Sequence, residues 1–120
     1  MTNGSRKDIV ERTFKFGVRI VKMGNSLPKT PAGFALGSQL ISSGTSIGAN
    51  IQEAQDAMSK KDFIHCVQIS LKEARETKFW IELITESLLI PASKTKLLIN
   101  ESDQLISILT IIAKHAKINS

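Results

Sequence analysis

Apolar residues recur at intervals of three and four positions along almost the whole chain, and this spacing constrains the fold more than any other feature. A helix places residues three and four apart on one face, whereas a strand alternates every two positions. Short stretches containing proline, glycine or N-capping residues divide this pattern into four segments. We predict helices over residues 5–25, 31–58, 60–89 and 93–118. Because the connections are short, the predicted fold is an all-α, up-and-down four-helix bundle in a single domain, 1–120.

Capping residues mark several of the predicted boundaries. Thr30 followed by Pro31 is typical of an N-cap and a first helical position. Ser59, with Asp62 three positions later, resembles a capping box with aspartate in the usual glutamate position. The first predicted helix ends at Gly24–Asn25, residue types that favour a left-handed C-cap.

Three glycines, Gly37, Gly44 and Gly48, fall inside the second predicted helix. Each lowers helix propensity by roughly 1 kcal/mol relative to alanine. We interpret them as positions where a neighbouring helix approaches closely. The alternative interpretation is a weak or kinked helix.

The composition argues against most kinds of catalytic or metal site. Cys66 is the single cysteine, which excludes a disulfide within the chain and a cysteine zinc site, and it is predicted to be a small core residue. His65 and His115 are far apart, and neither is followed at three or four positions by a carboxylate or a histidine. No phosphate-binding glycine loop or nucleophile elbow occurs. We therefore predict no enzymatic activity, no metal and no cofactor.

The apolar positions of the third and fourth predicted helices are spread over most of the helix circumference, as in Phe63–Leu71 and Leu97–Ile112. A bundle helix with one face in water needs an apolar stripe only somewhat wider than 100°. The surplus predicts a homo-oligomeric interface. The alternative is a monomer with exposed isoleucines.

Positive charge is concentrated in the first thirty residues. Seven lysines and arginines face only Asp8 and Glu11 there, a balance of +5 that equals the net charge of the whole chain. Four of these residues recur at spacings of three, four and three, which places them on one stripe of the first helix: Arg12, Lys15, Arg19 and Lys22. Such a stripe can contact the phosphates of RNA or DNA, and oligomerisation would multiply its field. The alternative is a solvated outer face of the bundle.

A second group of polar residues follows one face of the second predicted helix at spacings of three, four and three, namely Ser43, Ser46, Asn50 and Glu53. Asparagine is a mediocre helix former, so Asn50 in mid-helix predicts a specific hydrogen bond, for instance with Glu73 or Glu76 across a bundle or subunit interface. A ligand site is the alternative. Lysines and arginines interleave with the carboxylates of the third helix, which favours a solvated, ion-paired surface over general acid–base chemistry.

Residues 27–89, about half of the chain, resemble the bacterial four-helix-bundle proteins called 23S rRNA intervening-sequence proteins. The most specific matching runs are Ser46-Ile47-Gly48-Ala49-Asn50 and Lys72-Glu73-Ala74-Arg75-Glu76-Thr77. The resemblance implies a ring-like homopentamer without catalytic residues. The family is also similar to the accessory protein of diversity-generating retroelements, a basic pentamer that binds nucleic acid and a reverse transcriptase. Its characteristic residues match Ser46, Asn50, Glu53, Glu73, Glu76 and Trp80, which we interpret as structural or interface determinants.

Three functional hypotheses follow from the sequence. The first is a non-enzymatic oligomer that binds RNA or DNA through the basic stripe, and the second is a protein-binding scaffold without a nucleic-acid role. The third is a small-ligand binder or enzyme that uses Asn50 and the carboxylates of the third helix. The N-terminal segment lacks the apolar run of a secretory signal, and no apolar run is long enough to span a bilayer, so we expect a cytoplasmic protein with no membrane partner.

Overall fold

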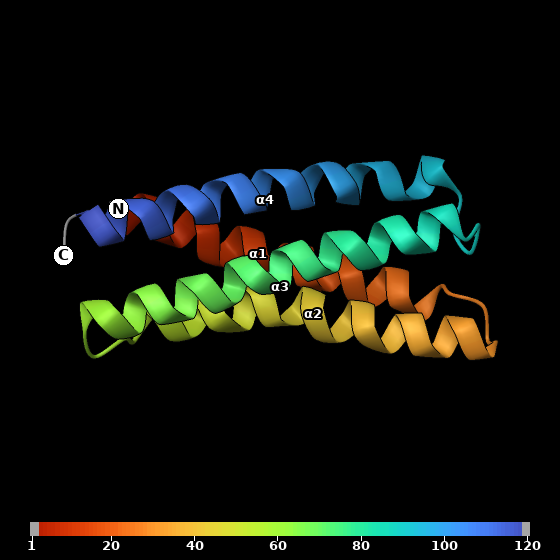
Figure 1. Cartoon of the computed structure of the whole chain (residues 1–120), viewed down its shortest axis with the longest axis horizontal. Helices are drawn as coiled ribbons and strands as arrows, with labels where there is room; N and C mark the ends of the chain where they lie inside the picture. Colours follow the sequence, from red (N-terminus) through yellow and green to blue (C-terminus); the bar gives the residue numbers. More distant parts are fainter. Residues whose placement is uncertain (1–2, 119–120) are drawn as a thin grey trace.

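The computed structural model describes residues 3–118, and within this range the chain forms four helices and no strand. The helices are α1 (Asn3–Asn25), α2 (Pro31–Gln55), α3 (Lys60–Glu86) and α4 (Ala92–Ile118). Each helix reverses the direction of the one before it, so the start of α1 and the end of α4 lie at the same end of a rod of 47 × 22 × 19 Å (Figure 1). The predicted all-α, up-and-down bundle is confirmed. The outermost two residues at each end of the predicted domain lie outside the described range.

Sequential helices pack extensively on one another, whereas α1 and α4 approach each other far less closely. The arrangement is therefore an α1–α2–α3–α4 series that closes only weakly between its first and last members. Fully buried side chains from all four helices form one core, with Phe16, Ile47, Ile81 and Leu105 among the largest. No helix in residues 3–118 carries an apolar stretch long enough to cross a membrane.

Two predicted N-caps are present. The Thr30 hydroxyl oxygen accepts a hydrogen bond of 3.1 Å from the Gly33 amide, and Pro31 is the first residue of α2. The Ser59 hydroxyl oxygen accepts a bond of 3.1 Å from the Asp62 amide. Both capping residues have extended backbone, which lets the side chain turn back to the first helical turn.

The predicted ends of the two central helices are each three residues too late, because α2 ends at Gln55 and α3 at Glu86. After α2, the Asp56 amide bonds to the carbonyls of Glu53 and Ala54 and the chain leaves the helix. The fourth helix begins at Ala92, one residue before the predicted start.

The left-handed C-cap predicted at Gly24–Asn25 is wrong, since Leu88 is the one described residue with positive φ, at 61°. Leu88 ends α3 in a Schellman motif: its amide bonds to the Thr85 carbonyl and the Leu89 amide bonds to the Ile84 carbonyl. This position normally holds glycine, because a Cβ is strained in the left-handed region.

The glycines of α2 do allow close helix approach. A Cβ built on Gly44 would lie 2.5 Å from Ile20 Cγ2 on α1, and one on Gly48 would lie 3.2 Å from the Thr13 carbonyl oxygen. Side chains larger than hydrogen at these two positions would therefore push α1 away from α2. The interpretation as close-approach positions is confirmed for Gly44 and Gly48.

Candidate functional site

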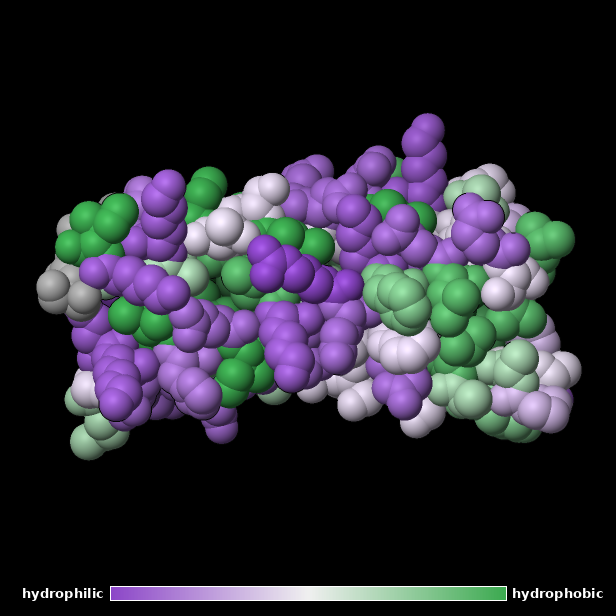
Figure 2. All heavy atoms as spheres, viewed as in Figure 1, coloured by the Kyte–Doolittle hydropathy of each residue, from purple (hydrophilic) through white to green (hydrophobic). Residues whose placement is uncertain are grey.

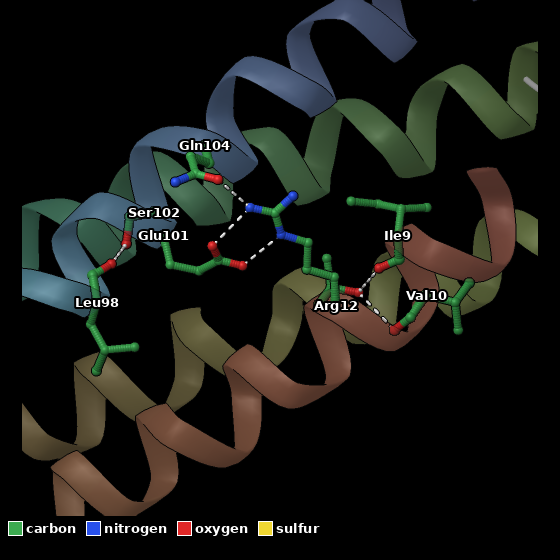
Figure 3. Close-up of polar contacts among 8 residues, drawn as sticks. Ile9, Val10, Arg12, Leu98, Glu101, Ser102 and Gln104 are labelled. Atoms are coloured by element: carbon green, nitrogen blue, oxygen red, sulfur yellow. Dashed lines mark hydrogen bonds and ion pairs between the residues drawn. The ribbon is translucent and has the colours of Figure 1, made fainter. Parts of the chain in front are cut away.

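The predicted basic stripe of α1 separates into residues with and without partners. Arg12 points across to α4, where its Nε donates to Glu101 Oε2 at 2.7 Å and its Nη2 donates to Glu101 Oε1 at 2.8 Å (Figure 3). Nη2 also donates to Gln104 Oε1 at 2.5 Å. The hydrogen bond with Glu101 raises the pKa of Arg12 above its ordinary value. This two-point clamp joins α1 to α4 where the helices otherwise touch little, so Arg12 has a structural task.

The other three residues of the stripe are exposed. Lys15 forms an ion pair of 2.7 Å with Glu11 one turn earlier, and the lysine lowers the pKa of that carboxyl. Such exposed pairs are weak and exchange readily with other ions. Arg19 and Lys22 form no ion pair or hydrogen bond with any residue of 3–118. The uncompensated part of the stripe is therefore Arg19 and Lys22, with Lys15 beside them.

A second basic region lies at the end of the bundle where α1 begins and α4 ends, and the sequence analysis missed it. Arg6 of α1, Lys60 of α3 and His115 of α4 line one cavity there. Lys7, Lys61, Lys114 and Lys117 are their neighbours in sequence, as are the oppositely charged Asp8 and Asp62. The sequence contained the information for this region. In an antiparallel bundle, the first and third helices begin at the end of the bundle where the second and fourth helices finish.

The six residues matched to the family motif flank the contact between α2 and α3, and we call this surface the α2–α3 face: Ser46, Asn50, Glu53, Glu73, Glu76 and Trp80. Two buried hydroxyls fix the register beneath it. Ser70 donates to the Ile47 carbonyl at 2.9 Å, and Thr77 donates to Ser43 Oγ at 3.0 Å. Residues that are scattered over 35 positions of sequence are thereby brought to one surface.

Within the chain, Asn50 makes no hydrogen bond to Glu73 or Glu76. Its amide nitrogen donates to the Ser46 carbonyl on its own helix at 2.8 Å, and the Ser46 hydroxyl donates to the Ser42 carbonyl at 2.7 Å. Bonds of this local kind are available to polar side chains in any exposed helix. The hydrogen bond of Asn50 therefore does not link α2 to α3.

Glu73 and Trp80 hold polar groups with unmet hydrogen-bonding capacity. Glu73 is half-buried, and burial, followed by the nearby charge of Glu76, raises the pKa of its carboxyl. The Trp80 indole Nε1 is buried and has no acceptor among residues 3–118. Its ring meets Phe79 edge-on at 5.0 Å, and Phe79 itself is 56% exposed. Leaving this donor buried without an acceptor costs stability.

The described residues contain no group of three or more histidine, cysteine, aspartate or glutamate side chains able to hold a metal ion. Cys66 is half-buried, and burial, then the charges of Glu53 and Asp62, raise the pKa of its thiol. A raised pKa lowers the fraction of reactive thiolate at neutral pH. Cys66 packs against the core, as expected for a structural residue.

The sequence profile of the family described as 23S rRNA-intervening sequence protein matches residues 6–111, which include parts of all four helices. The chain belongs to the 23S rRNA-intervening sequence protein family. It is also similar in structure to a crystallised protein of unknown function from the S23 ribosomal protein family of Bacteroides thetaiotaomicron. The two share 38% identity with a TM-score of 0.83, over 88% of this chain and 98% of that one. No curated protein matches the chain.

For this member of the 23S rRNA-intervening sequence protein family, the match extends beyond the motif segment. It includes the whole basic stripe from Arg12 to Lys22 and the Glu101 clamp partner on α4. The segments that carry the basic stripe of α1 and the α2–α3 face therefore both lie within the matched residues.

Proposed function

We propose that this protein is a non-enzymatic homo-oligomer that binds RNA or DNA through the exposed residues of the basic stripe. We call these residues the basic face of α1: Lys15, Arg19 and Lys22. The observation that carries the proposal is the exposure of Arg19 and Lys22 without any carboxylate partner in residues 3–118. The Arg12 clamp to Glu101 supports it, because the clamp holds α1 against α4 and so fixes the direction in which these cations point. Because Glu101 holds Arg12, we propose that Arg12 positions α1 and does not contact phosphate.

Exposed apolar side chains support the homo-oligomer, for which we propose the ring-like pentamer that the family resemblance implies. Phe14, Phe34, Leu88 and Leu97 are each 65% exposed or more. Figure 2 shows apolar side chains gathered toward the end of the bundle where α3 leads into α4. Burial of such side chains stabilises an assembly by about 25 cal/mol per Å² of apolar surface.

The proposal is tested by fluorescence anisotropy with a labelled RNA hairpin and a labelled DNA duplex over a series of salt concentrations. We expect the double variant Arg19→Ala/Lys22→Ala to weaken binding similarly for both probes. It should also reduce the slope of log affinity against log salt by about 1.8, since each lost phosphate contact contributes about 0.9. Light scattering on the same sample checks for five copies of the 13.2 kDa chain.

The matched control is Lys94→Ala/Lys96→Ala, which removes the same charge from exposed positions at the start of α4. This control should leave most of the affinity intact. If the two double variants lose equal affinity, the contact is a general charge effect and the assignment to α1 is wrong. If the native oligomer binds neither probe at low salt, the nucleic-acid proposal is refuted.

The α2–α3 face favours a second candidate function, a protein-binding scaffold. The exposed Phe79 ring, which packs edge-on against Trp80, is an aromatic side chain of the kind that anchors protein interfaces. A complex recovered from cell extract that survives nuclease and high salt, and that Phe79→Glu abolishes, would favour the scaffold over nucleic-acid binding. Loss of the complex on nuclease treatment would favour the first candidate.

A further inference from the structure

One end of the bundle contains a cavity of about 630 Å³ to which all four helices contribute. It lies where α1 begins, α2 meets α3 and α4 ends (Figure 1). Two features leave this space open. The helices α1 and α4 pack on each other only weakly, and the lining carries alanine at positions 54, 57 and 116, where larger side chains would fill the space.

One part of the cavity wall is apolar, and Gln55 and Ser59 add uncharged polar groups to the rest. Phe63 from α3 and Ile112 from α4 are half-buried and line it, and Ile111 at its edge remains 53% exposed. The volume falls within the range of about 300–1,000 Å³ that small-molecule pockets usually have. An apolar body placed here would cover surface that the chain leaves in contact with water.

The titratable groups of the lining are Arg6, Lys60 and His115, so each of them is basic and no carboxylate lines the cavity. The Arg6 guanidinium carbon lies 5.6 Å from the centroid of the Phe63 ring, which places a cation directly beside the apolar wall. The lysines next to the lining residues in sequence, at positions 7, 61, 114 and 117, are partly offset by aspartates at positions 8, 56 and 62. The site therefore offers an apolar wall and a positive rim.

We propose that this cavity binds a small amphipathic anion, with its acyl or aromatic body against Phe63 and Ile112 and its carboxylate, sulfonate or phosphate group at Arg6. Arginine presents a fork of donors that matches such oxyanions, and the bond is charge-assisted. Lys60 adds a second cationic side chain to the lining, beside the imidazole of His115. The ligand class follows from charge complementarity, and this site is separate from the basic face of α1 and from the α2–α3 face.

The test uses two fluorescent probes that differ by one group, 1-anilinonaphthalene-8-sulfonate and its uncharged counterpart N-phenyl-1-naphthylamine. We expect saturable binding of the sulfonate probe at one site per chain and weaker binding of the uncharged probe. Arg6→Gln should lower the affinity for the sulfonate probe about tenfold, which is the value of one charge-assisted hydrogen bond. The affinity for the uncharged probe should stay unchanged. The matched control is Lys96→Gln, at the opposite end of the bundle, which should change neither affinity.

Ala116→Trp fills the cavity from the last turns of α4 and should abolish binding of both probes, with the helical content checked by circular dichroism. Displacement of the sulfonate probe by decanoate would identify an acyl ligand, and displacement by 1-naphthoate would identify an aromatic acid. The proposal is refuted if Ala116→Trp folds and binds the probe normally, or if both probes bind equally and ignore Arg6→Gln. It is also refuted if the sulfonate probe shows no saturable binding to the folded native protein.

Discussion

Replacing Gly44 by alanine and replacing Gly17 by alanine are the same chemical change on opposite sides of the α1–α2 contact, and we expect stability effects of opposite sign. A Cβ at Gly44 would lie 2.5 Å from Cγ2, 2.8 Å from Cγ1 and 3.0 Å from Cβ of Ile20. Ile20 is fully buried and its β-branched side chain has little rotamer freedom in a helix, so it cannot move aside cheaply. A Cβ at Gly17 would have its nearest contacts at 3.8 and 3.9 Å, which is ordinary packing distance.

Both substitutions gain roughly 1 kcal/mol of helix propensity. Gly17→Ala keeps that gain, so we expect it to raise the free energy of unfolding by about 1 kcal/mol. Gly44→Ala also overpacks the core, which costs about 2 kcal/mol, so its net effect is a loss of about 1 kcal/mol. The two variants should therefore differ by about 2 kcal/mol, or roughly 8 °C in Tm for a chain of this size.

Urea unfolding followed by circular dichroism at 222 nm measures both values, at one fixed protein concentration because assembly shifts apparent stability. The double variant is informative as well. The two sites face each other, so its effect should depart from the sum of the single effects. If Gly44→Ala stabilises the protein as much as Gly17→Ala does, then close approach to Ile20 is not the reason for glycine at position 44.

Two further predictions concern the end and the middle of α3. Leu88→Gly should raise the free energy of unfolding by about 1 kcal/mol, since glycine removes the left-handed strain, whereas Ser87→Gly, with φ of −81°, should give no gain. Thermal unfolding of the two variants decides this. Glu73→Gln should raise Tm at neutral pH. The folded-state pKa of Glu73 lies above its unfolded value, so the native protein loses stability as the pH rises through that interval. Below the interval both states are protonated and the advantage should vanish. A gain that persists unchanged at acidic pH would contradict the assignment to burial of the charge.

Much of the fold could be predicted because it depends on local signals. Apolar spacing set the number of helices, and the hydroxyls of Thr30 and Ser59 set two of their first turns. Helix ends were predicted less well, because they depend on backbone conformation that residue type only biases. Leu88 occupies the left-handed position that glycine was expected to fill elsewhere.

For the candidate sites, too, features within one helix could be predicted from the sequence, and contacts between distant residues could not. Spacing along one helix predicts the basic stripe of α1, since a stripe is a property of a single element. The same reasoning could not show that Arg12 is clamped by Glu101, a residue 89 positions away on α4. Nor could it join Arg6, Lys60 and His115 at one cavity, because their proximity requires three helices to be packed.

The sequence by itself determined that this protein is an all-α bundle with a basic first helix and close-approach glycines on the second. Those features follow from helical periodicity and side-chain size, which act within one element or between neighbours. Only the tertiary structure decided which charges are neutralised and which remain exposed, and where the core is left open. Those outcomes depend on distances between atoms of residues that are far apart in the chain. A change of a few ångströms in such a distance breaks an ion pair or fills a cavity.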